Sequence, residues 1–424
     1  MAKLTVPRGT RDVLPDEWRV RHRVLDAARR RFEAAGYGRI MTPTFEHTEV
    51  FARGAGETSD IVTKEMYTFQ DRSERSLTLR PEGTAAVARA YVEQGLHREP
   101  QPVKLWYFAP MFRYEKPQEG RYREHWQIGA EAFGSDHPAV DAELIVLLAG
   151  LYTELGVPGV TLRLNSIGDA SSRAAYREQL VTFLRAHETQ LDEDSRARVD
   201  TNPLRVFDSK VPATIALMRD APKVTDSLDP ASAAHFATLQ ELLTAAGVTF
   251  ALDPSLVRGL DYYSRTVFEF SCSGLGAQDA VGGGGRYDGL VESLGGPATP
   301  AVGFGCGIER VLLAMAAGGD PAPVASADVY VCVAEESERA GAFKLVQALR
   351  AQDLRVEQDL AGRSLKGQLK QASRLGAAIA VVARAEGWQA QEMRGRVEHP
   401  LSRDGSAAVQ VAALVRTAAA TSGT

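Results

Sequence analysis

The chain has 424 residues and a formal net charge of −5, from 49 Lys and Arg against 54 Asp and Glu. Its composition, 44% hydrophobic and 24% charged, is typical of a soluble globular protein, and its length predicts two or three domains. Three widely spaced cysteines argue against a disulfide framework or a zinc cluster, and no apolar run approaches the ~18 residues of a membrane span, so we expect a cytoplasmic protein.

The N-terminal part predicts a helix followed by a short strand. Within residues 15–35, apolar residues recur at every fourth position and so share one helix face. These residues are Val20, Val24, Ala28 and Phe32. Gly36 is the expected stop of the helix, and residues 37–41 are expected to form a strand.

Aromatic and β-branched runs predict three further strands, over residues 103–112, 122–131 and 266–270. Residues 114–121 include a proline and a glycine, so the first two of these strands are expected to form a hairpin. Arg113 stands at the end of the first strand. Such an arginine is either held in a salt bridge or available to an anion such as phosphate, and we weigh the two equally.

Gln127, Gly129 and Glu131 alternate along the second strand and therefore share one of its faces. Two polar side chains that flank a glycine suit a small ligand on the sheet, with Gly129 leaving it room. The alternative is a stripe that faces solvent, and the spacing by itself favours this alternative.

Residues 170–248 are rich in charged, helix-forming residues and poor in strand formers, which predicts a helical insertion. Residues 256–270 mix strand formers with charged residues and two tyrosines. That mixture suits the wall of a pocket.

Two glycine clusters, at residues 282–289 and 303–310, match neither a dinucleotide-binding nor a phosphate-loop fingerprint. Glycine lets a backbone pass close to a ligand or to another strand. Arg310 falls in the first turn of an apolar helix, where the helix dipole disfavours a cation. It is therefore either a surface arginine or one kept there for an anion.

Residues 318–323 have the composition of a linker. The residues after them show a different order of expected strands and helices from the residues before them. Apolar runs at 329–333 and 378–382 and a strand near Val356 alternate with helical stretches, as in a small α/β domain. The Ala-rich tail is expected to form a final helix. We place the domain boundary near residue 324.

Six segments, taken together and in this order, resemble the signatures of histidyl-tRNA synthetases, a family of class II aminoacyl-tRNA synthetases. Residues 8–12 resemble the opening signature of the family, and 15–43 resemble motif 1. Residues 112–131 resemble motif 2, and 303–310 resemble motif 3. The two most specific matches resemble the histidine signatures of the family, at residues 256–270 and 282–290.

The resemblance implies an α+β fold, in which an antiparallel sheet is flanked by helices. It implies a catalytic domain over residues 1–323, with the helical insertion at about 170–248, and an α/β anticodon-binding domain over 324–424. The implied enzyme is a homodimer without a membrane segment. It activates L-histidine with ATP and Mg²⁺ to histidyl-adenylate, and then transfers histidine to the 3′ end of tRNA(His).

The resemblance also assigns roles to residues. Arg113 and Arg258 would be catalytic, with Arg258 beside the α-phosphate; no metal ligands are expected. The ATP site would comprise Arg113, Glu115 and Arg310. The histidine site would comprise Glu82, Gly83, Thr84, Arg113, Gln127, Glu131, Arg258, Tyr262 and Tyr263. Without the resemblance, Glu82 is more simply a helix-start acid after Pro81.

The tRNA-binding residues implied are Lys116 and Gln118 in the motif 2 loop, for the acceptor end. Lys366, Lys370 and Arg374 form a basic stripe at four-residue spacing on one helix of the last domain. That stripe is either a solvated helix face or a phosphate contact. The rival function is a non-catalytic paralogue that binds histidine and regulates histidine biosynthesis.

Overall fold

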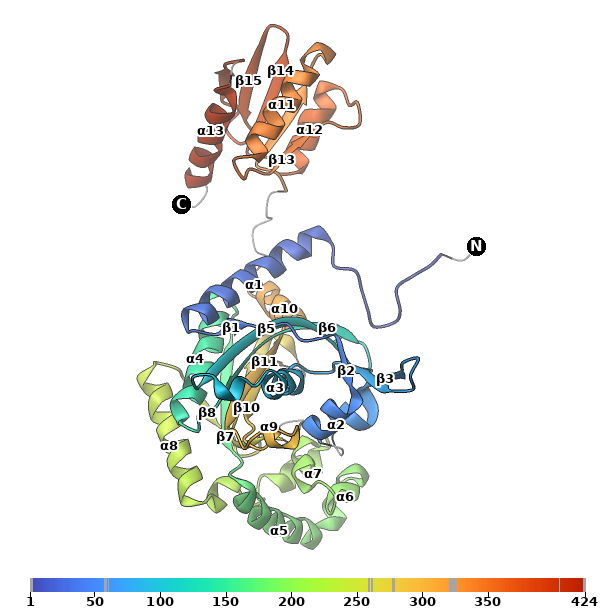
Figure 1. Ribbon diagram of the computed structural model, residues 1–424, viewed down its shortest axis with the longest axis vertical. Coiled ribbons are helices and arrows are strands. Elements are labelled where there is room, and N and C mark those ends of the chain that lie inside the picture. Colours follow the sequence, from blue (N-terminus) through green and yellow to red (C-terminus); the bar gives the residue numbers. More distant parts are fainter. Residues whose placement is uncertain are drawn as a thin grey trace. The chain divides into compact units, whose positions relative to one another are not determined.

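The computed structural model describes residues 3–56, 59, 61–257, 260, 262–276, 279–319, 326–403 and 405–421. The chain forms two compact units, Met1–Pro321 and Ala322–Thr424. Figure 1 shows the helices and strands of each unit along the chain. No helix among the described residues is long and apolar enough to cross a membrane.

The first unit is built on a mostly antiparallel sheet of eight strands. In spatial order the strands are β1 (Gly38–Arg39), β5 (Val103–Phe112), β6 (Glu124–Phe133), β11 (Ala301–Gly307), β10 (Ala280–Arg286), β9 (Ser264–Cys272), β7 (Val160–Ser166) and β8 (Ala251–Leu252). The expected hairpin is present as β5 and β6, which pair antiparallel along their full lengths. The strand expected at 37–41 is shorter, because only Gly38 and Arg39 pair with β5.

Helices cover one face of this sheet and make the main core. They are α1 (Pro15–Ala34), α4 (Pro138–Glu154), α8 (Pro230–Ala245) and α10 (Ile308–Ala317). The predicted apolar face of α1 is buried here through Val24, Ala28 and Phe32. This antiparallel sheet with its flanking helices confirms the predicted fold class.

Smaller elements lie toward the other face. A three-stranded sheet of β2 (Phe45–His47), β4 (Ser76–Leu79) and β3 (Tyr67–Gln70) stands with α2 (Thr48–Ala55), α3 (Thr84–Glu93) and α9 (Leu290–Ser293). Part of a second core, which includes Tyr91, Tyr107 and Tyr287, lies between α3, α9 and the main sheet. This core borders the site described below.

The helices of the insertion are α5 (Ala170–Ala186), α6 (Glu193–Arg198) and α7 (Pro212–Met218). A further core is drawn from α5, α7 and the turns between them, and Leu256, Tyr263 and Val267 contribute to it. These helices lie together at the lower end of Figure 1. Helix α8 falls within the range that the sequence assigns to the insertion, yet Phe236, Leu239 and Leu243 pack into the main core. An apolar stripe on α8 thus fixes it to the sheet.

The second unit is a five-stranded sheet between helices. Its strands, in spatial order, are β13 (Val356–Gln358), β12 (Val329–Val333), β14 (Ile379–Arg384), β15 (Gly387–Glu392) and β16 (Glu398–Leu401). Helices α11 (Arg339–Arg350) and α13 (Ala407–Thr421) contribute to one core, and α12 (Leu365–Arg374) contributes to another. The first three strands are parallel, as expected of an α/β unit; β15 and β16 add an antiparallel edge that the sequence did not predict.

Candidate active site

The two glycine clusters are neighbours in the sheet. Strand β10 pairs with β11, so that Gly283 lies opposite Gly305 and Gly285 opposite Gly303. On its other side, β11 pairs with β6 and places Gly303 opposite Glu131. A Cβ on Gly303 would collide with the Glu131 carboxylate. The glycines therefore leave space above the centre of the sheet, and the side chains of β6 fill part of it.

Glu131 is fully buried and accepts hydrogen bonds from three hydroxyl groups. Thr84 donates from Oγ1 to Oε1 over 2.8 Å, Tyr107 donates to the same oxygen over 3.4 Å, and Tyr287 donates to Oε2. Burial raises the pKa of Glu131 to about 8, and the hydroxyl donors oppose that rise. A stripe facing solvent is therefore excluded for Glu131.

Glu82, Gly83 and Thr84 form the entry to helix α3. Glu82 is buried and accepts the backbone N–H groups of Thr84, over 2.6 Å, and of Ala85, over 2.8 Å. Burial raises the pKa of its carboxyl above the ordinary value, against these hydrogen bonds. The simpler reading of Glu82 as a helix-start acid is thus realised, and Thr84 links this helix start to Glu131.

Tyr262 and Tyr263 stand just before β9, with their ring centroids 4.7 Å apart. The ring of Tyr262 meets that of Tyr287 edge-on at 5.5 Å. Tyr263 is buried in the core of the insertion and packs against Gly285. Tyr262 therefore belongs to the group of rings and hydroxyls around Glu131.

Beside this group lies a cleft of about 780 Å³. The predicted residues that line it are Arg113, Glu115, Gln127 and Arg310. Arg113 donates from Nε to the carbonyl of Pro81 over 2.7 Å and has one guanidinium nitrogen 3.9 Å from Glu115. Arg310 lies in the first turn of α10, as predicted.

Several cations lie close together in this cleft, which is also lined by four carboxylate residues, Glu115, Glu269, Asp279 and Glu309. Burial lowers the pKa of Arg310, and the charge of nearby Arg121 lowers it further. The pKa of Arg121 is lowered by burial and, to a smaller extent, by the charge of Arg113. Burial, aided by Arg113 and Arg121, lowers the pKa of His125 to about 3. Like charges held this close favour a bound polyanion, which would relieve their repulsion.

The cleft and the Glu131 group lie on the same face of β6. Gln127 lines the cleft, and Glu131 lies two alternations further along the same face of that strand. On the neighbouring strand β11, Gly305 and Gly303 are also two residues apart and share one face. A ligand with an anionic end and a small polar ring could therefore lie along this face, with the anion in the cleft.

One predicted detail of this face is wrong. Gly129 was expected to leave room for a ligand, but a Cβ at that position would collide with the phenol of Tyr107, as would a Cβ at Gly83. The space over both glycines is thus occupied by Tyr107 itself. Gly129 admits the ring that donates to Glu131.

Several site residues were not found from the sequence: Tyr107, Tyr287, Arg121 and His125. Tyr107 lies opposite Gly129 in the β5–β6 hairpin, so the register of that hairpin was the available signal. Tyr287 lies within the first glycine cluster. Of the predicted site residues, Arg258 lies outside the described residues.

The residues predicted to bind tRNA are exposed. Lys116 and Gln118 lie in the loop between β5 and β6, where the backbones of Gln118 and Arg121 form an isolated bridge. Lys366, Lys370 and Arg374 are exposed along α12, whose opposite face buries Gln368 and Ala372. These three belong to the second unit.

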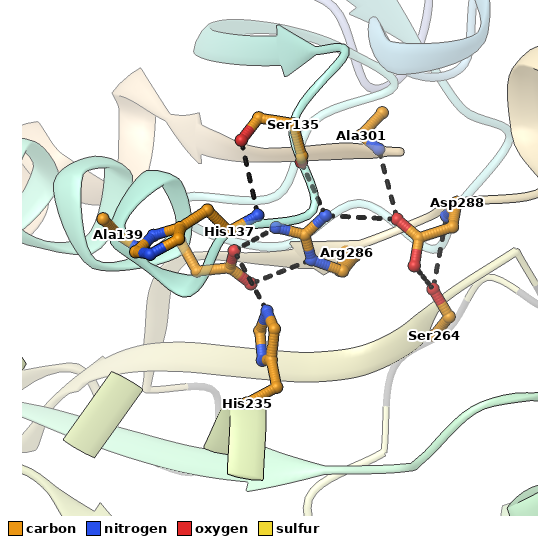
Figure 2. A network of polar contacts seen from close by, with 9 residues as sticks. Ser135, His137, Ala139, His235, Ser264, Arg286, Asp288 and Ala301 are labelled. Atoms are coloured by element: carbon orange, nitrogen blue, oxygen red, sulfur yellow. Dashed lines mark hydrogen bonds and ion pairs between the residues drawn. The ribbon is translucent and has the colours of Figure 1, made fainter. Parts of the chain in front are cut away.

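A buried ion network fixes the segment around Tyr287 (Figure 2). Arg286 is fully buried and binds Asp141 of α4 with two nitrogens, one of them over 3.3 Å. It also donates to the Ser135 carbonyl over 2.9 Å and to Asp288 over 3.2 Å. Asp288 in turn accepts the hydroxyl of Ser264, at the start of β9. The network thus ties together the chain segments that carry Tyr287 and Tyr262.

Comparison with known proteins agrees with this geometry. The family model described as histidyl-tRNA synthetase matches residues 9–311. A histidine–tRNA ligase from Moorella thermoacetica is 51% identical, with 92% of each chain covered, and one from Rubrobacter xylanophilus is 50% identical, with 89% of this chain and 90% of the relative covered. The apo histidyl-tRNA synthetase of S. aureus superposes with a TM-score of 0.80 at 34% identity, covering 97% of this chain and 100% of that one.

These matches run through both the glycine clusters and the segment that holds Glu131. They confirm the resemblance drawn from the six sequence segments. The chain belongs to the histidyl-tRNA synthetase family.

Proposed function

We propose that the protein is a histidine–tRNA ligase that activates L-histidine with ATP and then charges tRNA(His). A carboxylate oxygen of histidine attacks the α-phosphorus of ATP, the bond to the β-phosphate breaks, and histidyl-adenylate and pyrophosphate result. The 3′-terminal ribose hydroxyl then takes the acyl group, and AMP leaves. The observation that carries this proposal is that one face of β6 holds a buried carboxyl group, Glu131, and, further along, the edge of a cleft lined by several arginines.

In this proposal the imidazole of histidine lies against Glu131 and Tyr262. A ring with one donor and one acceptor edge is read by a carboxyl group on one side and a phenol on the other. Glu82, Gly83, Thr84 and Gln127 would surround the α-ammonium group, with Tyr263 closing the pocket. Apolar amino acids would leave these buried polar groups unpaired, which discriminates against them strongly.

The triphosphate lies in the cleft. Arg113 faces the α-phosphate and the histidine carboxylate, Arg310 binds the far phosphates, and Glu115 holds the adenine end. Guanidinium groups suit this role because they neutralise charge in the transition state without giving up a proton. We assign the catalytic role to Arg258 together with Arg113.

Mg²⁺ arrives in this proposal as the complex with ATP. Glu269 and Asp279 line the same cleft and offer carboxylate oxygens, the donor type that Mg²⁺ prefers. The ion would neutralise charge on the leaving pyrophosphate. Arg113 and Arg310 would orient the phosphates.

The tRNA is contacted at two places. Lys116 and Gln118 would read the acceptor end, since they are exposed on the loop that borders the cleft. The second unit would bind the anticodon region, with the exposed stripe of Lys366, Lys370 and Arg374 on its phosphates. Phosphate contacts position such a module, and contacts to bases give it specificity.

The active assembly is a homodimer in the cytoplasm. Met41 is 89% exposed, and the exposed rings of Phe45 and Phe69 meet edge-on at 6.2 Å. These apolar side chains on and beside the three-stranded sheet are suited to cover by a second copy. All three cysteines are free and buried, in keeping with a reducing compartment.

The rival, a non-catalytic regulator of histidine biosynthesis, is disfavoured. The relatives at about 50% identity are named as ligases, and they match about 90% of the chain. The two functions differ in one measurable step, because a regulator binds histidine without activating it.

The first test is histidine-dependent exchange of pyrophosphate into ATP. We expect exchange with histidine and none with the other amino acids, since only an imidazole pairs with both Glu131 and Tyr262. Radiolabelled pyrophosphate in the presence of ATP and Mg²⁺ measures this directly. Histidine binding without exchange would assign the regulator function instead.

The second test concerns the basic stripe of α12. Replacing Lys366, Lys370 and Arg374 together by Ala should lower kcat/KM for charging of tRNA(His) by about 10-fold or more, through lost phosphate contacts, with a shallower salt dependence. Exchange without tRNA should be unchanged. Replacing Arg339 and Arg350 of α11 is the matched control, and equal losses in both variants would show that α12 has no special role.

A further inference from the structure

The cleft is lined by a residue of the helical insertion. Lys210 lies between the 3₁₀ helix η4 (Pro203–Asp208) and α7, and it borders the same cleft as Arg113 and Arg310. The other described residues that line the cleft come from the main body of the first unit. The insertion thus places a single cation at the site where the proposed reaction needs positive charge.

Local contacts hold the loop that carries Lys210. Ser209, its neighbour, donates its hydroxyl to Asp192 over 2.7 Å, and the hydroxyl of Thr214 donates to the same oxygen over 2.8 Å. Although burial opposes it, these hydroxyls and Ser195 lower the pKa of Asp192. The carboxylate therefore stays ionised and fixes the chain on both sides of Lys210.

The other cations of the cleft have partners in the protein. Arg121 pairs with Glu115, Arg163 pairs with Glu269, and Arg113 donates to the Pro81 carbonyl. Among the residues that the structure describes, none forms an ion pair with the exposed ammonium group of Lys210. Lys210 is a flexible point charge that can meet a ligand phosphate without breaking an existing pair.

We propose that Lys210 is an ATP-binding residue supplied by the insertion, whose ammonium contacts the β- and γ-phosphates. This inference rests on the proposed function. When the α-phosphorus forms its bond to histidine and loses pyrophosphate, negative charge builds on the group that Lys210 faces. ATP binding would then also tie the insertion to the catalytic sheet.

The experiment is Lys210→Ala in the full-length protein, measured by histidine-dependent ATP–pyrophosphate exchange. We expect KM for ATP to rise about 10-fold, as for loss of one charge-assisted hydrogen bond, with KM for histidine unchanged. Lys210→Arg keeps the charge and should restore most of the affinity. Lys223→Ala is the control, because Lys223 is the other lysine of the insertion, is exposed and lines no described cavity.

Two results would overturn the inference. One is an unchanged KM for ATP in Lys210→Ala; the other is normal exchange with defective charging, which would place Lys210 on the tRNA instead. A circular-dichroism melt equal to that of the wild type shows that the variant is folded. Absence of exchange in the wild type would refute the proposed function itself, and this outcome is seen before any variant is compared.

Discussion

Asp141→Ala is expected to lower the free energy of unfolding by about 3–5 kcal/mol, the usual cost of removing one partner from a buried ion pair. Asp141 and Arg286 are both fully buried, and the guanidinium has no route to water. His235, which lies 3.7 Å from the same carboxylate, would lose its nearby negative charge as well. Of the contacts to Arg286 drawn in Figure 2, those with the Ser135 carbonyl and with Asp288 would remain.

Denaturant unfolding at one fixed protein concentration measures this loss, since a dimer would otherwise make the midpoint depend on concentration. Asp200→Ala is the matched control: Asp200 also pairs with an arginine, but both side chains are exposed, so its midpoint should stay near that of the wild type. Asp141→Leu combined with Arg286→Met should recover part of the loss, because no buried charge then lacks its partner. A wild-type midpoint for Asp141→Ala would show that the pair is not a stabilising unit.

The network also explains why Arg286 and Tyr287, within the first glycine cluster, hold a fixed position. Arg286 faces α4, and Tyr287, the next residue, points its hydroxyl at Glu131. Successive side chains of a strand point to opposite faces, so Arg286 points into the core and Tyr287 points into the site. If Asp141→Ala loses more histidine-activation activity than its unfolded fraction accounts for, the excess loss would indicate that Tyr287 is displaced.

Local patterns in the sequence predicted the elements whose contacts are local. The hairpin of β5 and β6 followed from two aromatic strands and a loop with proline and glycine. The strands β15 and β16 were missed because they are short; β15 carries only two apolar side chains, Trp388 and Ala390, among polar residues. Helix α8 is as poor in strand formers as the rest of the range assigned to the insertion, and its long-range packing on the sheet separates it from α5.

The site required pairings that no local pattern contains. The two glycine clusters are some 20 residues apart in the chain, and the sheet order, which puts β11 between β6 and β10, brings them together beside Glu131. Gly129 was read as an opening because glycine signals space, but a single strand does not reveal that Tyr107 of the neighbouring strand fills it. Strand alternation and helix position singled out Glu131 and Arg310 as candidates, and the family resemblance assigned their roles; the hydroxyl donors around Glu131 required the structure.

Glu131→Gln should lower kcat/KM for histidine in the exchange reaction by about 10- to 100-fold, the value of a charge-assisted hydrogen bond. The amide keeps the size of the side chain but cannot share a proton with the imidazole. Burial holds the pKa of Glu131 at about 8, whereas a free histidine ring has a pKa of ~6.5. Between about pH 6.5 and 8, Glu131 of the free protein is protonated and the ring of free histidine is neutral. The complex therefore keeps the one proton of Glu131, and binding neither takes up nor releases a proton.

The pH dependence separates this mechanism from a simple loss of contact. Above pH 8 the free Glu131 is ionised, and binding must take up a proton, so KM for histidine in the wild type should rise about fivefold from pH 8 to pH 9. In Glu131→Gln that rise should vanish, because nothing at position 131 titrates. Glu124→Gln, on the same strand, should keep the rise. An equal alkaline rise in wild type and Glu131→Gln would assign it to another group and remove the shared proton from the mechanism.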